Sequence, residues 1–169
     1  ALEAIAVSNC TTGLHLALIV GGITKGHDVI VPSFSYIATT NAVIHAGANP
    51  VFADVSIETG NLTAETISAA ITASTKAVIL VHQAGVPAQI DEIKSLCDLH
   101  GILLIEDAAC AIGSKYKNDL IGSHSSLVVF SFHPRKVLTT GEGGMICTSN
   151  PEWAIRLRRL REHGMSSSA

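Results

Sequence analysis

Lys136 is the side chain in this sequence best placed for covalent chemistry. It follows the apolar run Leu127–Phe130 and the hydroxyl of Ser131, and the glycine-rich residues 139–144 come next. A lysine amine at a strand end, beside a hydroxyl and flexible glycines, can form a Schiff base with a carbonyl compound. Such an amine must first lose its proton, which burial or a neighbouring cation such as Arg135 favours. The ordinary alternative is a solvated loop lysine.

A carboxylate, Asp107, ends a second apolar run, Ile102–Ile105, one residue after Glu106. Together with Lys136 it suggests pyridoxal phosphate chemistry, in which a carboxylate serves the pyridinium nitrogen and a lysine holds the aldehyde. The alternative is that Asp107 caps a helix beginning at Ala108. If strand alternation persists, Glu106 points the other way and is structural.

Further polar groups could complete a cofactor site. Residues Asn9–Gly13 open a predicted helix, where free backbone amides can bind an anion, although an ordinary threonine N-cap would look the same. Ser131 offers a hydroxyl to a phosphate, and Tyr36 either stacks on a flat ring or packs half-buried. Because ligands gather at the carboxyl ends of parallel strands, we expect Asp107, Ser131 and His82 on one rim.

Strand-like and helix-like segments alternate along the chain. The expected strands cover residues 29–31, 51–53, 77–81, 102–105, 127–130 and 145–147, and the expected helices cover 12–20, 35–46, 63–71, 91–100 and 152–162. Asp91 is the expected N-cap of the fourth helix, and Gly47 and Gly101 are expected to end helices. Continuous apolar strands suit a sheet covered on both faces, so the pattern predicts an α/β domain with a mostly parallel sheet.

The composition excludes several classes of function. A chain of 169 residues is most simply one domain, and 47% hydrophobic with 15% charged residues argues against disorder. The net charge of −3 gives no electrostatic reason to bind nucleic acid, and the apolar stretches are too short for a membrane span. The four cysteines have neither zinc nor disulfide spacing, which predicts no metal site and reduced thiols in the cytoplasm.

Taken together, these segments resemble the DegT-type aminotransferases, which act on nucleotide-linked keto sugars. The matching segments are residues 9–18, 29–39, 106–109, 130–136 and 141–144. The resemblance implies that residues 1–169 form the large, three-layer α/β/α domain of the fold-type I pyridoxal phosphate enzymes. It also implies a cytoplasmic homodimer that transfers an amino group from glutamate to a nucleotide sugar, in sugar or polysaccharide biosynthesis.

The resemblance assigns roles to individual residues. Lys136 would carry the cofactor covalently and later shuttle a proton, and Asp107 would face the pyridinium nitrogen. Many relatives have Gln or His where this chain has Cys110, near the phenolic oxygen of the cofactor, and a thiol there donates only weakly. The other implied contacts are the ring-stacking Tyr36 and the phosphate ligands Thr11, Thr12 and Ser131.

Family members begin earlier and continue into a smaller C-terminal domain, so we expect this chain, which starts at Ala1, to be a fragment of a longer protein. Two alternatives remain open at this point. The chain could be an inactive fragment, or a binding or assembly module that retains the fold. It could also come from another fold-type I enzyme, acting on an amino acid by elimination or desulfuration.

Overall fold

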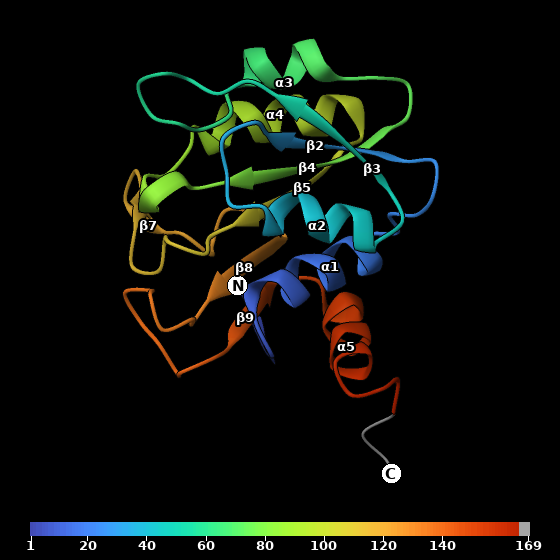
Figure 1. The fold of residues 1–169 in the computed structure, drawn as a ribbon, viewed down its shortest axis with the longest axis vertical. Helices are drawn as coiled ribbons and strands as arrows, with labels where there is room; N and C mark the ends of the chain where they lie inside the picture. The colour runs from blue at the N-terminus through green and yellow to red at the C-terminus, as the bar shows by residue number, and fades with distance from the viewer. Residues whose placement is uncertain (166–169) are drawn as a thin grey trace.

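The computed structural model describes residues 1–165, so the last four residues of the domain predicted over 1–169 lie outside it. One sheet dominates. Its strands in spatial order are β1 (Glu3–Val7), β9 (Gly144–Thr148), β8 (Leu127–Ser131), β5 (Leu103–Asp107), β4 (Thr75–Val81), β2 (Asp28–Pro32) and β3 (Asn49–Ala53) (Figure 1). The strands from β8 to β3 are parallel, whereas β9 runs antiparallel to both its neighbours.

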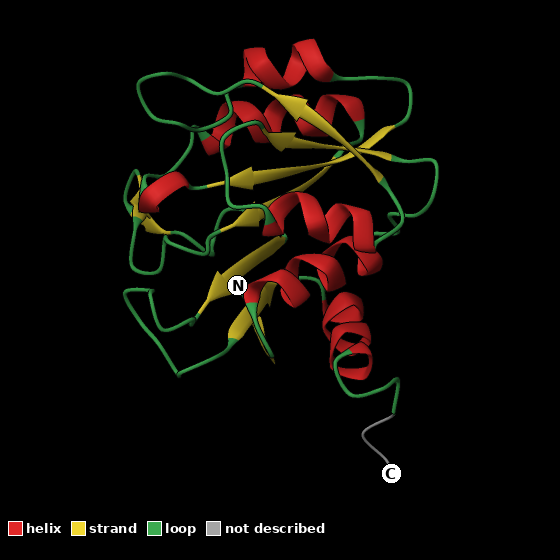
Figure 2. Cartoon of the chain, in the orientation of Figure 1, coloured by secondary structure: helices red, strands yellow, loops and turns green. Residues whose placement is uncertain are grey.

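Helices cover both faces of this sheet. One layer contains α1 (Cys10–Val20), α2 (Ala38–His45) and α5 (Pro151–Leu160), and the other contains α3 (Ala64–Ala70) and α4 (Ile90–His100) (Figure 2). Strand side chains alternate between the two cores: Val29 and Val31 pack in the first and Ile30 in the second. Because both faces are covered, the strands are apolar on both sides, and the predicted three-layer α/β/α architecture is confirmed.

Some short elements were not expected from the sequence. They are the edge strand β1, the 3₁₀ turn η1 (Gln83–Gly85) and the two-stranded hairpin of β6 (Lys115–Tyr116) and β7 (Asp119–Leu120). In β1 only Ile5 is fully buried, so this strand lacks the continuous apolar run that marks the central strands. Its pairing with β9 joins the start of the chain to residues near Thr148.

Two predicted helix starts were wrong. The second helix begins at Ala38 and not at Ser35, because the Ser35 hydroxyl instead lies 3.0 Å from the Thr39 hydroxyl in the turn that leads into α2. Helix α4 begins at Ile90, so Asp91 is in the first turn and is not the N-cap, although its charge still suits the helix dipole there. Gly47 and Gly101 follow α2 and end α4 with φ of 78° and 63°, as predicted.

The first turn of α1 lies unusually close to the sheet. A Cβ added at Gly144 would lie 2.7 Å from the backbone carbon of Asn9, and one added at Gly13 would lie 2.6 Å from a methyl of Val129. Both glycines therefore permit a contact that any side chain would obstruct. They fix the N-terminus of α1 against β8 and β9.

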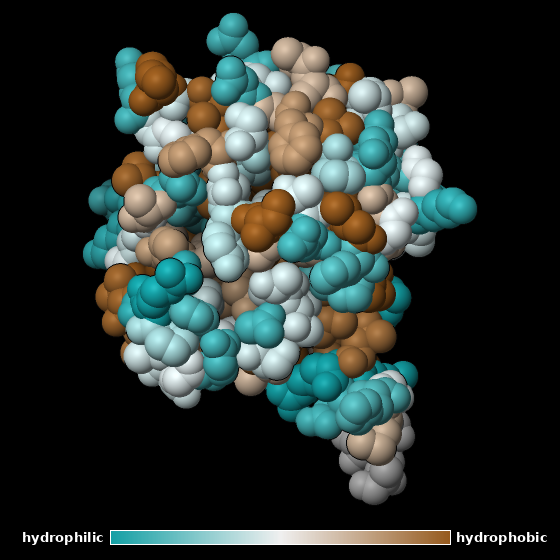
Figure 3. All heavy atoms as spheres, in the orientation of Figure 1, coloured by the Kyte–Doolittle hydropathy of each residue, from teal (hydrophilic) through white to brown (hydrophobic). Residues whose placement is uncertain are grey.

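The surface gives no sign of a spanning segment. Among the described residues, no helix is both long and apolar enough to cross a membrane. On the face shown in Figure 3, hydrophobic and hydrophilic side chains are interspersed. Interspersed apolar side chains are normal for a protein surface.

Candidate active site

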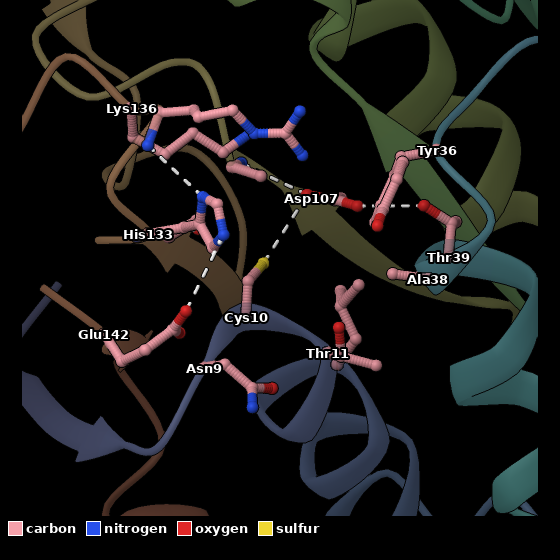
Figure 4. A pocket seen from close by; sticks show the side chains of 14 residues that line it. Asn9, Cys10, Thr11, Tyr36, Ala38, Thr39, Asp107, His133, Lys136 and Glu142 are labelled. Atoms are coloured by element: carbon pink, nitrogen blue, oxygen red, sulfur yellow. Dashed lines mark hydrogen bonds and ion pairs between the residues drawn. The ribbon is translucent and has the colours of Figure 1, made fainter. Parts of the chain in front are cut away.

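A cavity of about 380 Å³ opens where β5 and β8 end, on the side covered by α1 and α2 (Figure 4). Its lining comes from four segments of the chain, residues 9–14, 36–39, 107–109 and 131–142. Asp107 and Lys136 both line it, so the two side chains expected to act on one cofactor face one cavity.

Asp107 is a buried carboxylate with several hydrogen-bond donors. Its Oδ1 accepts from the amide of Ala109 at 3.1 Å, and its Oδ2 accepts from the hydroxyl of Thr39 at 3.0 Å. The thiol of Cys10 lies 3.8 Å from Oδ1. Burial raises the pKa of Asp107, while the Ala109 amide, the Thr39 hydroxyl and the charge of Lys136 oppose that rise. The carboxylate thus caps a local turn and borders the cavity, but no helix begins at Ala108, so the alternative that Asp107 is a helix N-cap was wrong.

The Lys136 amine is directed at a sulfur atom. Its Nζ donates to Sγ of Cys110 at 3.1 Å, and the Cys110 side chain is exposed. The backbone around Lys136 is a tight turn, with its amide bonded to the carbonyl of His133 at 2.9 Å. Arg135 also lines the cavity and adds positive charge beside the amine. Cys110 therefore meets the lysine directly.

The predicted phosphate ligands divide into two groups. Thr11 and Ser131 line the cavity. Thr12 instead donates its amide and its hydroxyl to Oδ1 of Asn9, at 2.8 and 3.1 Å, and its side chain lines a separate hollow near Arg161. A helix leaves its first amides without internal partners, so Thr11 and the N-terminus of α1 present donors to an anion.

Tyr36 lies at the mouth of the cavity. Its side chain is 72% exposed, so the alternative of half-buried packing is wrong. It follows β2 in the turn before α2, on the other side of Asp107 from Lys136 in Figure 4. The ring is therefore free to stack on a flat ligand.

His82 does not lie on the rim where the sequence placed it. Its Nε2 is 2.8 Å from Oε2 of Glu106, and both side chains are completely buried. Because Nδ1 of His82 accepts the amide of Ala88 at 3.2 Å, the proton must be on Nε2, which donates to Glu106. Strand alternation explains the correction, since His82 follows Leu80, which faces the α3 and α4 layer.

Several lining residues were not singled out from the sequence. His133 and Glu142 line the cavity with Nε2 and Oε1 3.6 Å apart, and both flank Lys136 in a loop that folds back through a bond from Phe132 to Gly143. Their nearness to Lys136 in the sequence was an available signal. Thr39 and Cys10 gave no local signal, because each meets Asp107 only through the tertiary fold.

Comparisons with known proteins point in one direction. A model of the DegT/DnrJ/EryC1/StrS aminotransferase family matches residues 1–169. The solved aminotransferase from Psychrobacter cryohalolentis is 40% identical, with a TM-score of 0.97, over 100% of this chain and 43% of its own.

Two further solved structures carry ligands. NtdA from Bacillus subtilis, with bound cofactor PMP, is 30% identical over 99% of this chain and 38% of its own, with a TM-score of 0.93. DesI, solved in the presence of its TDP-sugar product, is 38% identical over 96% of this chain and 41% of its own, with a TM-score of 0.91. The present chain spans less than half the length of each of these proteins.

Proposed function

We propose that this chain, which belongs to the DegT/DnrJ/EryC1/StrS aminotransferase family, forms the pyridoxal-phosphate-binding part of an enzyme that aminates a nucleotide-linked keto sugar with glutamate as donor. The observation that carries the proposal is that Asp107 and Lys136 line one cavity. The PMP bound to NtdA supports the cofactor, and the TDP-sugar product of DesI supports the substrate class. Membership of an aminotransferase family disfavours the alternative of an elimination or desulfuration enzyme.

The residues present fit this cofactor. The N-terminus of α1, Thr11 and Ser131 offer donors to a phosphate, and the exposed ring of Tyr36 offers a stacking surface. A buried acid and an amine are available for the two reactive edges of a ring. When bound, pyridoxal phosphate supplies an aldehyde that carries the amino group and a ring that withdraws electrons from the reacting carbon.

Two side chains of this chain perform the chemistry. Asp107 would keep a proton on the ring nitrogen, because an opposite charge favours the charged form of its partner. Nζ of Lys136 would hold the cofactor through its aldehyde and, when free, would serve as the base that moves a proton between carbon atoms. Cys110, whose Sγ accepts from that Nζ, orients the amine.

The assembly and location follow the same proposal. We expect the full-length protein to be a homodimer working in sugar or polysaccharide biosynthesis in the cytoplasm. The exposed side chains of Tyr36 and Ile37 beside the cavity, 72% and 60% exposed, are available to a partner subunit. Free thiols at Cys10 and Cys110 suit a reducing compartment. Light scattering on the full-length protein tests the dimer.

Borohydride labelling tests the cofactor and its lysine. The full-length protein purified with pyridoxal phosphate should absorb visible light, and borohydride should bleach it and leave the cofactor mass on the peptide containing Lys136. Lys136→Arg should lose the label, whereas Lys94→Arg, on the exposed face of α4, should keep it. A colourless protein that takes up no added cofactor would defeat the proposal.

A substrate panel tests the reaction. Nucleotide-linked keto sugars should accept nitrogen from glutamate, detected by mass spectrometry of the amino sugar and by 2-oxoglutarate release. The matched free keto sugars should react much more slowly. Amination of the free sugars alone would contradict the substrate class but leave the aminotransferase standing.

A further inference from the structure

We propose that Thr39 is a positioning residue, and that a hydroxyl chain from Ser35 through Thr39 holds the Asp107 carboxylate ionised and in one orientation. This inference deepens the proposed function, and its consequence for cofactor binding rests on that function. The hydroxyl chain itself is formed by protein side chains and is present without the cofactor.

The contact is long-range and closed to solvent. Thr39 is the second residue of α2 and its side chain is only 1% exposed. Its Oγ1 lies 3.0 Å from Oδ2 of Asp107 and 3.0 Å from Oγ of Ser35. A buried hydroxyl between two oxygen atoms has only one proton, so it donates a hydrogen bond to one of them and accepts a hydrogen bond from the other.

The order of protons follows from the carboxylate. An ionised carboxylate only accepts hydrogen bonds, so Thr39 gives its proton to Asp107 and therefore accepts the proton of Ser35. A hydrogen bond donated to the charged form of an acid favours that form. The chain therefore opposes the effect of burial, which raises the pKa of Asp107.

The same bonds also fix orientation. Thr39 holds Oδ2 and the amide of Ala109 holds Oδ1, so the carboxylate cannot turn about its own axis without breaking one of them. Its remaining acceptor directions are then set relative to the cavity. Such preorganisation is what a ring nitrogen at a defined position needs.

Other titratable groups also face Asp107. Cys10 from α1 lies 3.8 Å away, and Lys136 from the loop after β8 lowers the pKa of Asp107 through its charge, whereas His82 after β4 is turned toward Glu106. Burial and Asp107 itself raise the pKa of Cys10 well above its ordinary value, so Cys10 stays a neutral thiol. Thr39 is the side-chain hydroxyl bonded to the carboxylate.

Two substitutions of Thr39 in the full-length protein test the proposal. Thr39→Val removes the hydroxyl at nearly constant volume, and Thr39→Ser keeps it. In Thr39→Val we expect pyridoxal phosphate to bind the apoprotein roughly tenfold or more weakly, the size of a lost bond to a charged group. Loss of binding on acidification should also begin at higher pH, because the carboxyl without this donor is protonated more readily. Thr39→Ser should restore both properties.

Controls separate positioning from folding. Thr40→Val changes the neighbouring, half-buried threonine of α2 and should leave affinity and the acidic limit unchanged. Ser35→Ala removes only the outer donor and should shift the acidic limit in the same direction by less, which provides the test if Thr39→Val does not fold. Equal affinity and equal acidic limits in wild type and Thr39→Val, or equal impairment in Thr39→Ser and Thr39→Val, would overturn the inference.

A cofactor-free readout distinguishes the two proposals. Carbon NMR of the apoprotein should show the Asp107 carboxyl titrating at higher pH in Thr39→Val than in wild type. An unchanged titration overturns the role of Thr39 even if the cofactor binds. A shifted titration in a wild-type protein that takes up no pyridoxal phosphate would retain the hydroxyl chain and defeat the proposed function.

Discussion

Two neighbouring carboxylates at the end of β5 lie in contrasting environments. Glu106 faces the α3 and α4 side, is completely buried and is closed off by His82. Asp107 faces α1 and α2, is 5% exposed and borders the cavity. Burial alone therefore does not distinguish the acid that borders the cavity from the one that does not. The two acids differ in their hydrogen-bond partners and in whether they border the cavity. Strand alternation places Glu106 on one face of the sheet and Asp107 on the other.

Replacing each acid by its amide should give the largest contrast in activity. Asp107→Asn in the full-length enzyme should lower turnover about a hundredfold or more, because it leaves the charged ring nitrogen without its buried partner. Glu106→Gln should keep turnover within a few-fold once folded protein is compared. Steady-state kinetics on equal amounts of folded enzyme measures both. Similar losses in the two variants would break the comparison.

Stability should show the opposite order. Glu106→Ala leaves the buried Nε2–H of His82 without an acceptor and should lower the free energy of unfolding by about 1–3 kcal/mol. Asp107→Ala should cost less, because its donors lie beside a cavity that water can enter. Urea unfolding of the apoproteins gives both values. A larger loss in Asp107→Ala would reverse the assignment of the structural acid.

The pH dependence of stability sharpens the difference. Burial raises the pKa of Asp107 above 3.8 in the folded state. Between pH 3.8 and that raised pKa the folded protein holds a proton that the unfolded chain has released, so the free energy of unfolding falls as the pH rises through this window. Asp107→Asn should lack this loss. Subtracting its unfolding curves from those of wild type across the window isolates the effect, and identical curves would show that Asp107 titrates normally.

The smallest effect should be a difference in thiol reactivity between the two sides of the sheet. Burial raises the pKa of Cys97, on α4, to about 11, whereas Cys110 is exposed beside Lys136. Thiolates are the reactive form, so iodoacetamide should modify Cys110 well before Cys97. Peptide mass spectrometry over time gives the order. Early modification of Cys97 would mean that the α4 side opens readily.

Much of this arrangement could be predicted from the sequence. The central strands are continuous apolar runs that can be recognised in the sequence. The polar residues that end two of them, Asp107 and Ser131, line the cavity because parallel strands end at one edge of the sheet. The sequence motif around Lys136 also identified the loop that lines the cavity. In each of these cases a local signal determines the position.

The errors arose where position depends on distant contacts. His82 follows the end of β4, yet it lies on the same face of the sheet as Leu80, two residues earlier, and so points away from the cavity. The end of a strand alone therefore did not predict its position. Thr39 is an unremarkable threonine in a helix until α2 brings it 3.0 Å from Asp107.

The pairing of β1 with β9 has a consequence for biosynthesis. Residues Glu3–Val7 leave the ribosome long before their ladder partners, Gly144–Thr148. Since Gly144 also abuts the first turn of α1, that turn gains its final support only when residue 144 has emerged. A nascent chain stalled earlier would leave the apolar sides of α1 and β8 uncovered, and such surfaces recruit chaperones. The end of the cavity beside the N-terminus of α1 is thus completed only after residue 144 has been translated, although the residues of that turn are translated well before it.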